Sequence, residues 1–287
     1  MKTALVTGCS SGIGLATAVE FARGGIFTFA TMRDLSKAGE LELLIKNENL
    51  PMKIIKLDVT DEKSVDDCLA AIAADRGGLD ILVNNAGVMI MGSFEDVSTE
   101  DFDLQFKTDF LGPVMLMRKT VRIMMKQQKD NDGIRGHIVN ISSIAGKIPF
   151  KFSSAYVASK FALEGISESI SDEIRSFGIK VTIIEPGVVK TKFWQNMKFT
   201  TKENSLYEKE LDNWFSLGRT LFEKTPVMPQ DVASKVLAST RDSSTPLRVV
   251  VGDDAQFFLD KYAKDAAEPE KFKSWFENQL KELIGQG

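Results

Sequence analysis

Short apolar runs of strand length recur along the 287-residue chain and alternate with longer amphipathic stretches. The runs are rich in Val and Ile without polar alternation, which is typical of strands in a parallel sheet covered on both faces. They are Thr3–Thr7, Ile26–Thr31, Lys53–Leu57, Ile81–Val83, His137–Ile141, Lys180–Ile184 and Arg248–Val251, and the helical patterns between them are Gly14–Arg23, Lys63–Ala74, Glu100–Gln127, Ala155–Phe177 and Asp231–Ser239. This alternation predicts a doubly wound α/β fold over residues 1–287, with a mainly parallel seven-stranded sheet in a single domain.

Two further segments do not belong to this alternation. Residues 191–228 follow the sixth predicted strand and are rich in large apolar side chains. Residues 253–287 form the tail, where a one-sided helical spacing from Pro269 to Gly285 predicts a helical C-terminal extension. The large residues are Phe193, Trp194, Met197, Phe199, Tyr207, Trp214, Phe215, Leu221 and Phe222 in the first segment, closed by Pro226 and Pro229, and Phe272, Trp275, Phe276, Leu280 and Leu283 in the second.

The composition argues against several classes of protein. The net charge is −4 and no segment is strongly basic, so we expect no nucleic-acid partner. Two cysteines cannot form a disulfide framework, and a single histidine, His137, inside an apolar run, argues against a zinc site and a Ser-His-Asp hydrolase. Because we find no apolar stretch of about 18 residues and no signal-peptide pattern, we expect a cytoplasmic protein without a membrane span or a metal.

A glycine-rich turn directly follows the first predicted strand. It reads Thr7-Gly8-Cys9-Ser10-Ser11-Gly12-Ile13-Gly14, and a helical pattern begins at its end. Glycines let the backbone approach a pyrophosphate, and free N–H groups at a helix N-terminus favour negative charge. We therefore predict that Gly8, Ser10, Ser11, Gly12, Ile13 and Gly14 bind a dinucleotide. For Cys9, a small residue tolerated in the turn is favoured over a reactive thiol.

The end of the second predicted strand bears on which dinucleotide is bound. Arg33 comes first after the strand and can form a charge-assisted fork with a 2′-phosphate, whereas Asp34 would repel that phosphate. The position of Arg33 favours NADP(H), with NAD(H) as the alternative. The competing interpretation is that Arg33 and Asp34 are only a surface pair at a strand end.

Tyr156 and Lys160 lie four residues apart in a helical pattern, so their side chains share one face. A tyrosine has a reference pKa of about 10 and needs a neighbouring cation to act near neutral pH. A unit charge about 4 Å away is worth about 4 kcal/mol at an effective dielectric constant of about 20, so Lys160 can lower the pKa of the phenol. The Tyr-x-x-x-Lys spacing alone is weak evidence for such a site.

Together these features closely resemble the short-chain dehydrogenase/reductase family, and in residues 30–35 and 161–165 its 17β-hydroxysteroid and retinol dehydrogenase branch. The matching motifs occur in family order and follow strand ends, where open α/β sheets bind ligands. They are Thr7–Gly14, Asp58-Val59, Asn84-Asn85-Ala86-Gly87, Ile141-Ser142-Ser143, Tyr156–Lys160 and Pro186-Gly187. The resemblance implies a Rossmann fold and an oxidoreductase that moves a hydride between a nicotinamide and an alcohol or carbonyl carbon.

The resemblance also implies roles for individual residues. Tyr156 would be the general acid or base, Lys160 would lower its pKa and bind the nicotinamide ribose, and Ser143 would bind the substrate oxygen. Ser143 is preferred to Ser142 because it lies thirteen residues before Tyr156, as in the family. Cofactor contacts are implied for Asp58, Val59, Asn85, Ala86, Gly87, Pro186, Gly187, Val189 and Thr191.

Asp109 departs from the family pattern, which has an asparagine at this place. In the family that asparagine supports a helix bend and a water chain leading to the lysine. A carboxylate can accept the same hydrogen bonds and raise the pKa of Lys160, or it can hold Lys160 in a salt bridge. We count Asp109 with the catalytic residues and expect the activity to survive.

Residues 191–228 match the place of the family's substrate lid, and their aromatic and Met content implies an apolar pocket for a lipophilic alcohol or carbonyl compound. The competing interpretation is that these side chains only pack the lid. The apolar surface of the two long predicted helices implies a homodimer or homotetramer, as in the family. Two other functions stay open: a catalytically silent NADP(H)-binding regulator and a 3-oxoacyl carrier-protein reductase.

Overall fold

Seven parallel strands form the central sheet of the computed structural model, which describes residues 1–193, 196–224 and 227–283. Their order across the sheet is β3-β2-β1-β4-β6-β7-β9. The strands are β1 (Thr3–Val6), β2 (Phe27–Met32), β3 (Met52–Lys56), β4 (Ile81–Asn84), β6 (Gly136–Ile141), β7 (Ile179–Pro186) and β9 (Arg248–Val251). The predicted doubly wound fold is confirmed, and each strand lies within two residues of its predicted bounds.

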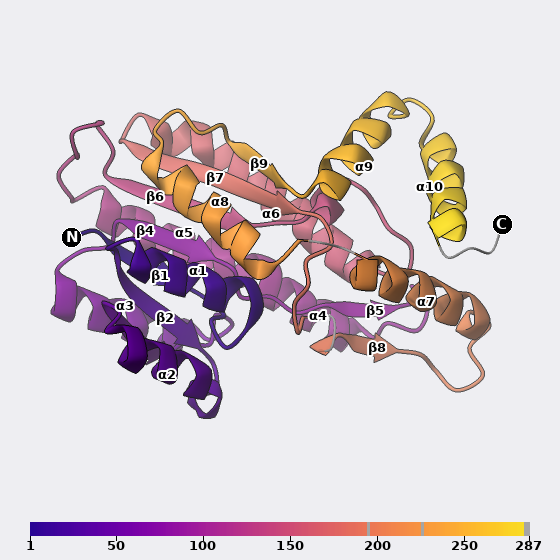
Figure 1. Ribbon diagram of the computed structural model, residues 1–287, viewed down its shortest axis with the longest axis horizontal. Coiled ribbons are helices and arrows are strands. Elements are labelled where there is room, and N and C mark those ends of the chain that lie inside the picture. The colour runs from indigo at the N-terminus through magenta and orange to yellow at the C-terminus, as the bar shows by residue number, and fades with distance from the viewer. Residues whose placement is uncertain (194–195, 225–226, 284–287) are drawn as a thin grey trace.

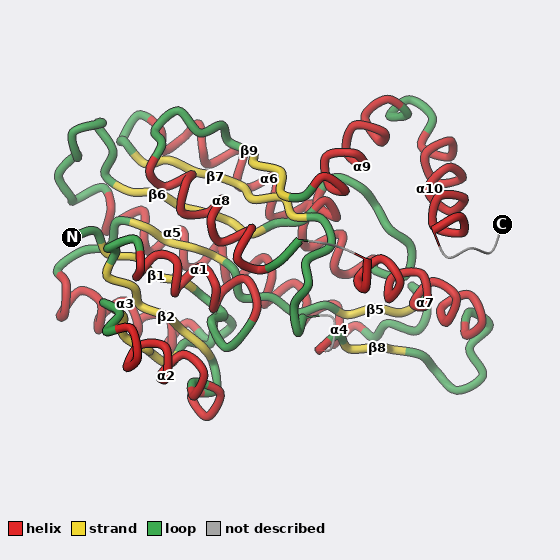
Figure 2. The backbone as a smooth tube through the Cα atoms, viewed as in Figure 1, coloured by secondary structure: helices red, strands yellow, loops and turns green. Residues whose placement is uncertain are grey.

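Helices cover both faces of this sheet (Figures 1 and 2). One face carries α1 (Gly12–Arg23), α2 (Gly39–Glu48) and α8 (Pro229–Arg241), and the other carries α3 (Glu62–Arg76), α5 (Gly112–Met124) and α6 (Ser154–Arg175). Successive residues of a strand point to opposite faces, so Ala4 and Val6 enter one apolar cluster and Leu5 enters the other. Burial on both sides is the physical reason for the uninterrupted apolar runs.

The long helix predicted from Glu100 to Gln127 consists of three pieces. They are α4 (Thr99–Phe106), the π-helical turn η2 (Lys107–Leu111) and α5. Pro113, at the start of α5, has no N–H to donate to the carbonyl of Asp109, which favours an irregular turn at this place. The turn brings Asp109 into the interior, where its side chain is 0% exposed.

A second group of elements lies beyond the carboxyl ends of the strands, at the right of Figure 1. The short strands β5 (Ile90–Gly92) and β8 (Lys198–Thr200) pair in parallel, and the helices are α7 (Glu208–Lys224), α9 (Asp253–Lys264) and α10 (Pro269–Leu283). The three helices pack with the 3-10 turn η3 (Ile144–Gly146) around a third apolar cluster that includes Phe258, Phe272 and Phe276. The 3-10 turn η1 (Leu35–Lys37) follows β2.

Some of the residues named in the sequence analysis lie outside the described residues, and some elements of the structure were not predicted. Trp194, Pro226 and Gly285 lie outside the described residues, as do the side chains of Leu280 and Leu283. The helix predicted from Pro269 is α10, whereas α2, β5, β8, α7 and α9 were not predicted as separate elements. Within the described residues, no helix combines the length and apolar character needed to cross a membrane.

Candidate active site

A cavity of about 430 Å³ opens at the carboxyl ends of the central strands, beside the point where the strand order reverses between β1 and β4. Such a point is where open α/β sheets bind ligands. Most predicted site residues line it: Gly8, Ser10, Ser11, Gly12, Ile13, Arg33, Asp58, Val59, Asn85, Ala86, Gly87, Ser143, Tyr156, Lys160, Pro186, Gly187, Val189 and Thr191. Gly14 and Asp109 are not part of the lining and are buried behind it.

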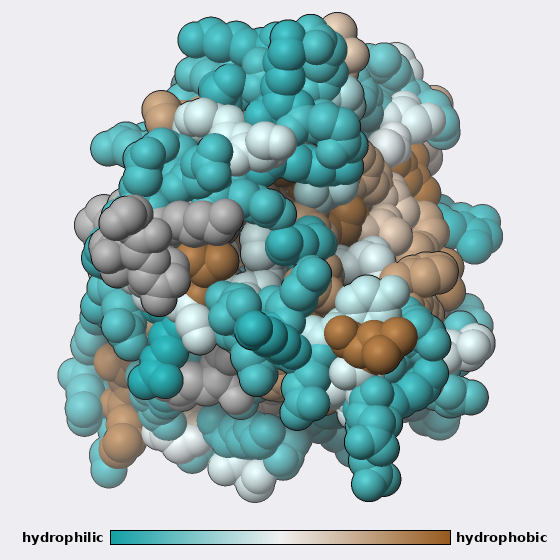
Figure 3. Space-filling model, turned by 90° about the vertical axis from the view of Figure 1, so that its right-hand side faces the viewer, coloured by the Kyte–Doolittle hydropathy of each residue, from teal (hydrophilic) through white to brown (hydrophobic). Residues whose placement is uncertain are grey.

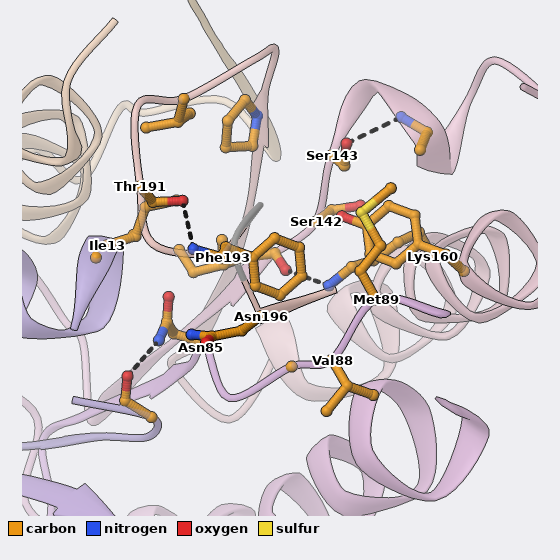
Figure 4. A pocket seen from close by; sticks show the side chains of 18 of the residues that line it. Ile13, Asn85, Val88, Met89, Ser142, Ser143, Lys160, Thr191, Phe193 and Asn196 are labelled. Atoms are coloured by element: carbon orange, nitrogen blue, oxygen red, sulfur yellow. Dashed lines mark hydrogen bonds between the residues drawn. The ribbon is translucent and has the colours of Figure 1, made fainter. Parts of the chain in front are cut away.

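The glycine turn needs glycine for two different reasons. Gly8 and Gly12 have φ angles of 72° and 61°, in the left-handed region that disfavours other residues. At Gly14 the reason is space, because a Cβ would lie 2.3 Å from both the Asn85 Nδ2 atom and the Gly8 carbonyl oxygen. Asn85 Nδ2 donates to the Thr7 and Gly8 carbonyls at 2.8 and 3.2 Å (Figure 4). These two hydrogen bonds hold the start of the glycine turn in place.

The turn fits the pyrophosphate of a dinucleotide. Helix α1 begins at Gly12, and the Ser11 side chain makes no capping hydrogen bond to it. The first backbone N–H groups of the helix therefore stay available to an anion at the helix N-terminus. Ser10, Ser11 and Ile13 line the cavity beside these groups.

The charges after β2 and β3 fit the adenosine end of such a ligand. Arg33 lines the cavity, whereas Asp34 does not, because its carboxylate accepts hydrogen bonds from the Ser36 amide and hydroxyl at 3.0 and 2.7 Å. These bonds hold the pKa of Asp34 below its usual range. Asp58 lines the cavity, and its Oδ1 atom accepts from the Thr60 amide and hydroxyl at 3.0 and 2.7 Å.

Tyr156, Lys160 and Asp109 form a chain of buried groups, of which Tyr156 and Lys160 line the cavity and Asp109 lies behind them. The Lys160 Nζ atom lies 5.5 Å from the centre of the Tyr156 ring and donates to the Ile141 carbonyl at 3.1 Å. It also lies 3.3 Å from Asp109 Oδ2, so the salt bridge, one of the two arrangements expected for Asp109, is present. The other carboxylate oxygen, Oδ1, accepts from the Val88 amide at 2.9 Å.

Lys160 lowers the pKa of Tyr156 as expected, but other groups oppose this effect. Burial raises the pKa of the phenol; Lys160 lowers it, and the Asp109 carboxylate raises it again, so the pKa stays above its ordinary value. For Lys160, burial lowers the pKa, but Asp109 and Tyr156 outweigh burial and raise it. Burial also raises the pKa of Asp109 against the opposing effect of Lys160. Lys160 alone therefore does not make the phenol acidic, because burial of the ring and, after it, the Asp109 carboxylate oppose its effect.

The two candidate serines have different surroundings. Ser143 lines the cavity, and its Oγ atom accepts from the Ala145 amide at 3.1 Å, which leaves the hydroxyl proton for another acceptor. Ser142 is only 4% exposed, and its Oγ atom has no hydrogen-bond partner among the described residues. Figure 4 shows both serines, Lys160, Thr191 and Phe193 among the residues that line the cavity. The Phe193 ring centre lies 6.3 Å from that of Tyr156.

Most of the remaining wall of the cavity is apolar and comes from segments that lie far apart in the chain. Phe193, Trp214, Phe215 and Leu221 lie in the predicted lid, and Phe258 and Phe276 belong to α9 and α10. Met89, Met91 and Phe150 also line the cavity and were not predicted, because the three-residue strand β5 and the loops that hold Met89 and Phe150 are too short to carry a periodic signal. Figure 3 shows the end of the molecule at α7 and α10, where patches of hydrophobic surface interrupt a mostly hydrophilic one.

Cys9 and His137 do not line the cavity and take no part in the proposed site. Burial raises the pKa of Cys9 to about 12, and its Sγ atom donates to the Val6 carbonyl, so the thiol is protonated. His137 contacts the Thr182 hydroxyl at 2.8 Å within the sheet, and burial lowers its pKa to about 3. The described residues contain no group of three His, Cys, Asp or Glu side chains that could hold a metal ion.

Comparison with known proteins agrees with this geometry. Residues 2–202 match the family described as short chain dehydrogenase. The chain is 35% identical over 258 residues to retinol dehydrogenase 8 of Bos taurus, covering 86% of this chain and 80% of that protein. A short-chain dehydrogenase from Streptomyces avermitilis superposes with a TM-score of 0.80 at 32% identity over 97% of both chains. A metagenomic short-chain oxidoreductase in complex with NADP has a TM-score of 0.68 at 26% identity, covering 87% of this chain and 96% of that one.

These matches confirm the resemblance to the retinol dehydrogenase branch that the motifs indicated. The chain belongs to the short-chain dehydrogenase family of oxidoreductases.

Proposed function

We propose that the protein is an NADP(H)-dependent oxidoreductase that interconverts an alcohol and a ketone or aldehyde on a lipophilic substrate. One observation carries the proposal: Ser143, Tyr156 and Lys160 line a cavity whose other walls are the glycine turn and a set of aromatic side chains. The turn suits a dinucleotide, the aromatic wall suits an apolar substrate, and the three polar side chains suit the reacting oxygen between them.

The preference for NADP(H) is supported by the charges beside the glycine turn. Arg33 lines the cavity, while Asp34 is held by Ser36 and does not face it. A guanidinium without a competing carboxylate favours a 2′-phosphate. The NADP complex of the metagenomic relative is consistent with this proposal.

When bound, a nicotinamide cofactor would supply or accept the hydride of the proposed reaction. Tyr156 gives its hydroxyl proton to the carbonyl oxygen during reduction and takes it back during oxidation. Its raised pKa keeps the phenol protonated at neutral pH, which is the form that reduction requires. The Ser143 hydroxyl donates to the same oxygen, and the Lys160 ammonium stabilises the phenolate that remains.

We further propose that residues 191–228 act as the substrate lid. Their contribution to the cavity includes Phe193, Trp214, Phe215 and Leu221, and each such side chain that a ligand covers is worth about 1.5–3 kcal/mol. Bulky apolar carbonyl compounds should therefore be better substrates than small polar ketones or sugars. Much faster turnover of the small polar compounds would contradict this assignment.

We also expect a homodimer or homotetramer. Leu104, Leu111 and Phe161, on α4, η2 and α6, are 39%, 50% and 42% exposed, which is apolar surface that a second copy would cover. Light scattering coupled to size-exclusion chromatography tests the assembly, and a monomer at micromolar concentration would contradict it.

The catalytic proposal is tested by NADPH oxidation with a panel of ketones and aldehydes. Tyr156→Phe keeps the ring and removes the hydroxyl, so kcat/KM should fall by about 10²–10⁴-fold while NADPH binding is unchanged. Retained turnover in this variant would refute the role of Tyr156. If the wild-type protein binds NADPH but reduces no carbonyl compound, the silent regulator is the correct function instead. Exclusive turnover of carrier-linked 3-oxoacyl chains would favour the reductase alternative.

A further inference from the structure

In the loop after β7, residues 187–190, most backbone amides donate hydrogen bonds to other segments of the chain. The Gly187 N–H donates to the Val251 carbonyl at 3.1 Å, and the Lys190 N–H donates to the Val227 carbonyl at 2.9 Å. The Val188 N–H donates to a side chain, the Oδ2 atom of Asp254, at 3.1 Å. Of residues 187–190, only Val189 has an amide without an acceptor in the described part of the chain.

Asp254 is enclosed by the backbone of two separate segments. It lies in the first turn of α9, 66 residues beyond Val188, and does not line the cavity. A Cβ on Gly187 would lie 2.4 Å from its Oδ2 atom, and a Cβ on Gly252 would lie 2.4 Å from its Oδ1 atom. The carboxylate therefore fits only because both positions are glycine. Its Oδ1 atom is buried and has no hydrogen-bond partner among the described residues.

We propose that Asp254 is a positioning residue for the nicotinamide end of the cofactor. By holding the Val188 N–H toward α9, its carboxylate fixes the loop in the form that leaves the Val189 N–H for the carboxamide oxygen of the nicotinamide. Hydrogen bonds to a carboxylate are roughly twice as strong as neutral ones, so this bond restrains the loop firmly. The inference rests on the proposed function, because it requires a nicotinamide cofactor.

The proposal predicts that Asp254 affects the binding of one end of the cofactor and not of the other. Asp254 contacts the loop after β7, whereas the glycine turn, Arg33 and Asp58 follow β1, β2 and β3. Loss of the carboxylate should therefore weaken ligands that carry a nicotinamide and leave the adenosine part unaffected. A merely structural role would weaken both kinds of ligand together.

The experiment measures the binding of NADP⁺ and of 2′-phospho-ADP-ribose, which lacks the nicotinamide, by isothermal titration calorimetry. In Asp254→Ala we expect the Kd of NADP⁺ to rise about tenfold, equal to about 1.4 kcal/mol, with the Kd of the fragment within twofold of wild type. Asp254→Asn can still accept from the Val188 N–H and should restore NADP⁺ binding to within about threefold. Asp253→Ala removes an exposed carboxylate from the same helix turn and should change neither constant.

Equal weakening of both ligands in Asp254→Ala, or no weakening of either, overturns the proposal. If that variant does not fold, Asp254→Glu takes its place, because a longer side chain cannot fit between the two glycines and must displace the loop. It should weaken NADP⁺ and not the fragment, and any other pattern counts against the proposal. Failure of the proposed function is distinct: the wild-type protein would then bind neither NADP⁺ nor the fragment, and the inference would fall with it.

Discussion

Replacing Asp109 with asparagine removes the charge that faces Lys160 and keeps an acceptor for the Val88 amide. The Coulomb attraction across 3.3 Å is about 5 kcal/mol at an effective dielectric constant of about 20, but the cost of burying both ions offsets much of it. Removing one partner of a buried pair typically costs about 3–5 kcal/mol. Because the asparagine keeps one hydrogen bond and Lys160 lies on the cavity wall, we expect a loss of about 2 kcal/mol in unfolding free energy.

The same change should shift the pH dependence of activity. Asp109 raises the pKa of both Lys160 and Tyr156, so its removal lowers both. Alcohol oxidation requires the phenolate, and therefore its rise in kcat/KM with pH should move to lower pH. We expect the maximal turnover of Asp109→Asn to stay within about tenfold of wild type.

The assay is kcat/KM for alcohol oxidation measured between about pH 6 and pH 10, with chemical denaturation for the unfolding free energy. Asp101→Asn is the matched control, because Asp101 is a buried carboxylate that pairs with Lys198 and does not line the cavity. It should reduce stability without moving the pH profile. An unshifted profile in Asp109→Asn would refute the electrostatic coupling, and a rise in turnover by orders of magnitude would show that the salt bridge impairs Lys160.

Three further predictions concern stability and cofactor choice. Burial and Glu164 raise the pKa of Glu185 to about 7, so the folded state keeps a proton that the unfolded state releases above about pH 4.5. Stability therefore falls as the pH rises from about 4.5 to 7, by at most about 3–4 kcal/mol. Glu185→Gln should remove this fall, and a Tm difference between pH 5 and pH 8 as large as that of wild type would contradict it. Arg33→Ala should raise the Kd of NADP⁺ about 10- to 100-fold and change that of NAD⁺ less than twofold, whereas equal losses in calorimetry would exclude a 2′-phosphate contact. Gly14→Ala should destabilise the protein by about 1–3 kcal/mol because of its 2.3 Å contacts, whereas Gly165→Ala, with nothing within 4 Å, should be neutral or stabilising in thermal unfolding.

The fold could be predicted to the extent that its elements are periodic and buried. The strands in the middle of the sheet were found because both of their faces are covered, which leaves an apolar run in the sequence. The edge strand β3 has two exposed lysines and was found from Ile54 and Ile55 between them. β5 and β8 have three residues each and pair with one another across about 100 residues of chain, so neither carries a signal of its own in the sequence. α2 escaped prediction because Leu41 is its only buried residue, so its apolar periodicity is weak.

Some residues of the candidate site could be predicted from the sequence, and others could not. The glycine turn, Ser143, Tyr156 and Lys160 carry recognisable residue types at recognisable spacings. Asp254 has no such signal, because its partner is a backbone amide 66 residues away and its environment consists of two glycines. The contributions of Met89 and Phe150 to the cavity were also beyond prediction, since only the packing of loops brings them there.

The sequence by itself determined the order of the motifs along the chain, the family and the chemical groups available for a reaction, because these depend on local spacing and on residue type. Only the tertiary structure decided how those groups act on one another. Asp109 and Lys160 form an ion pair, and the pKa of Tyr156 stays raised, because burial and through-space charge depend on distances between segments that the chain order does not contain.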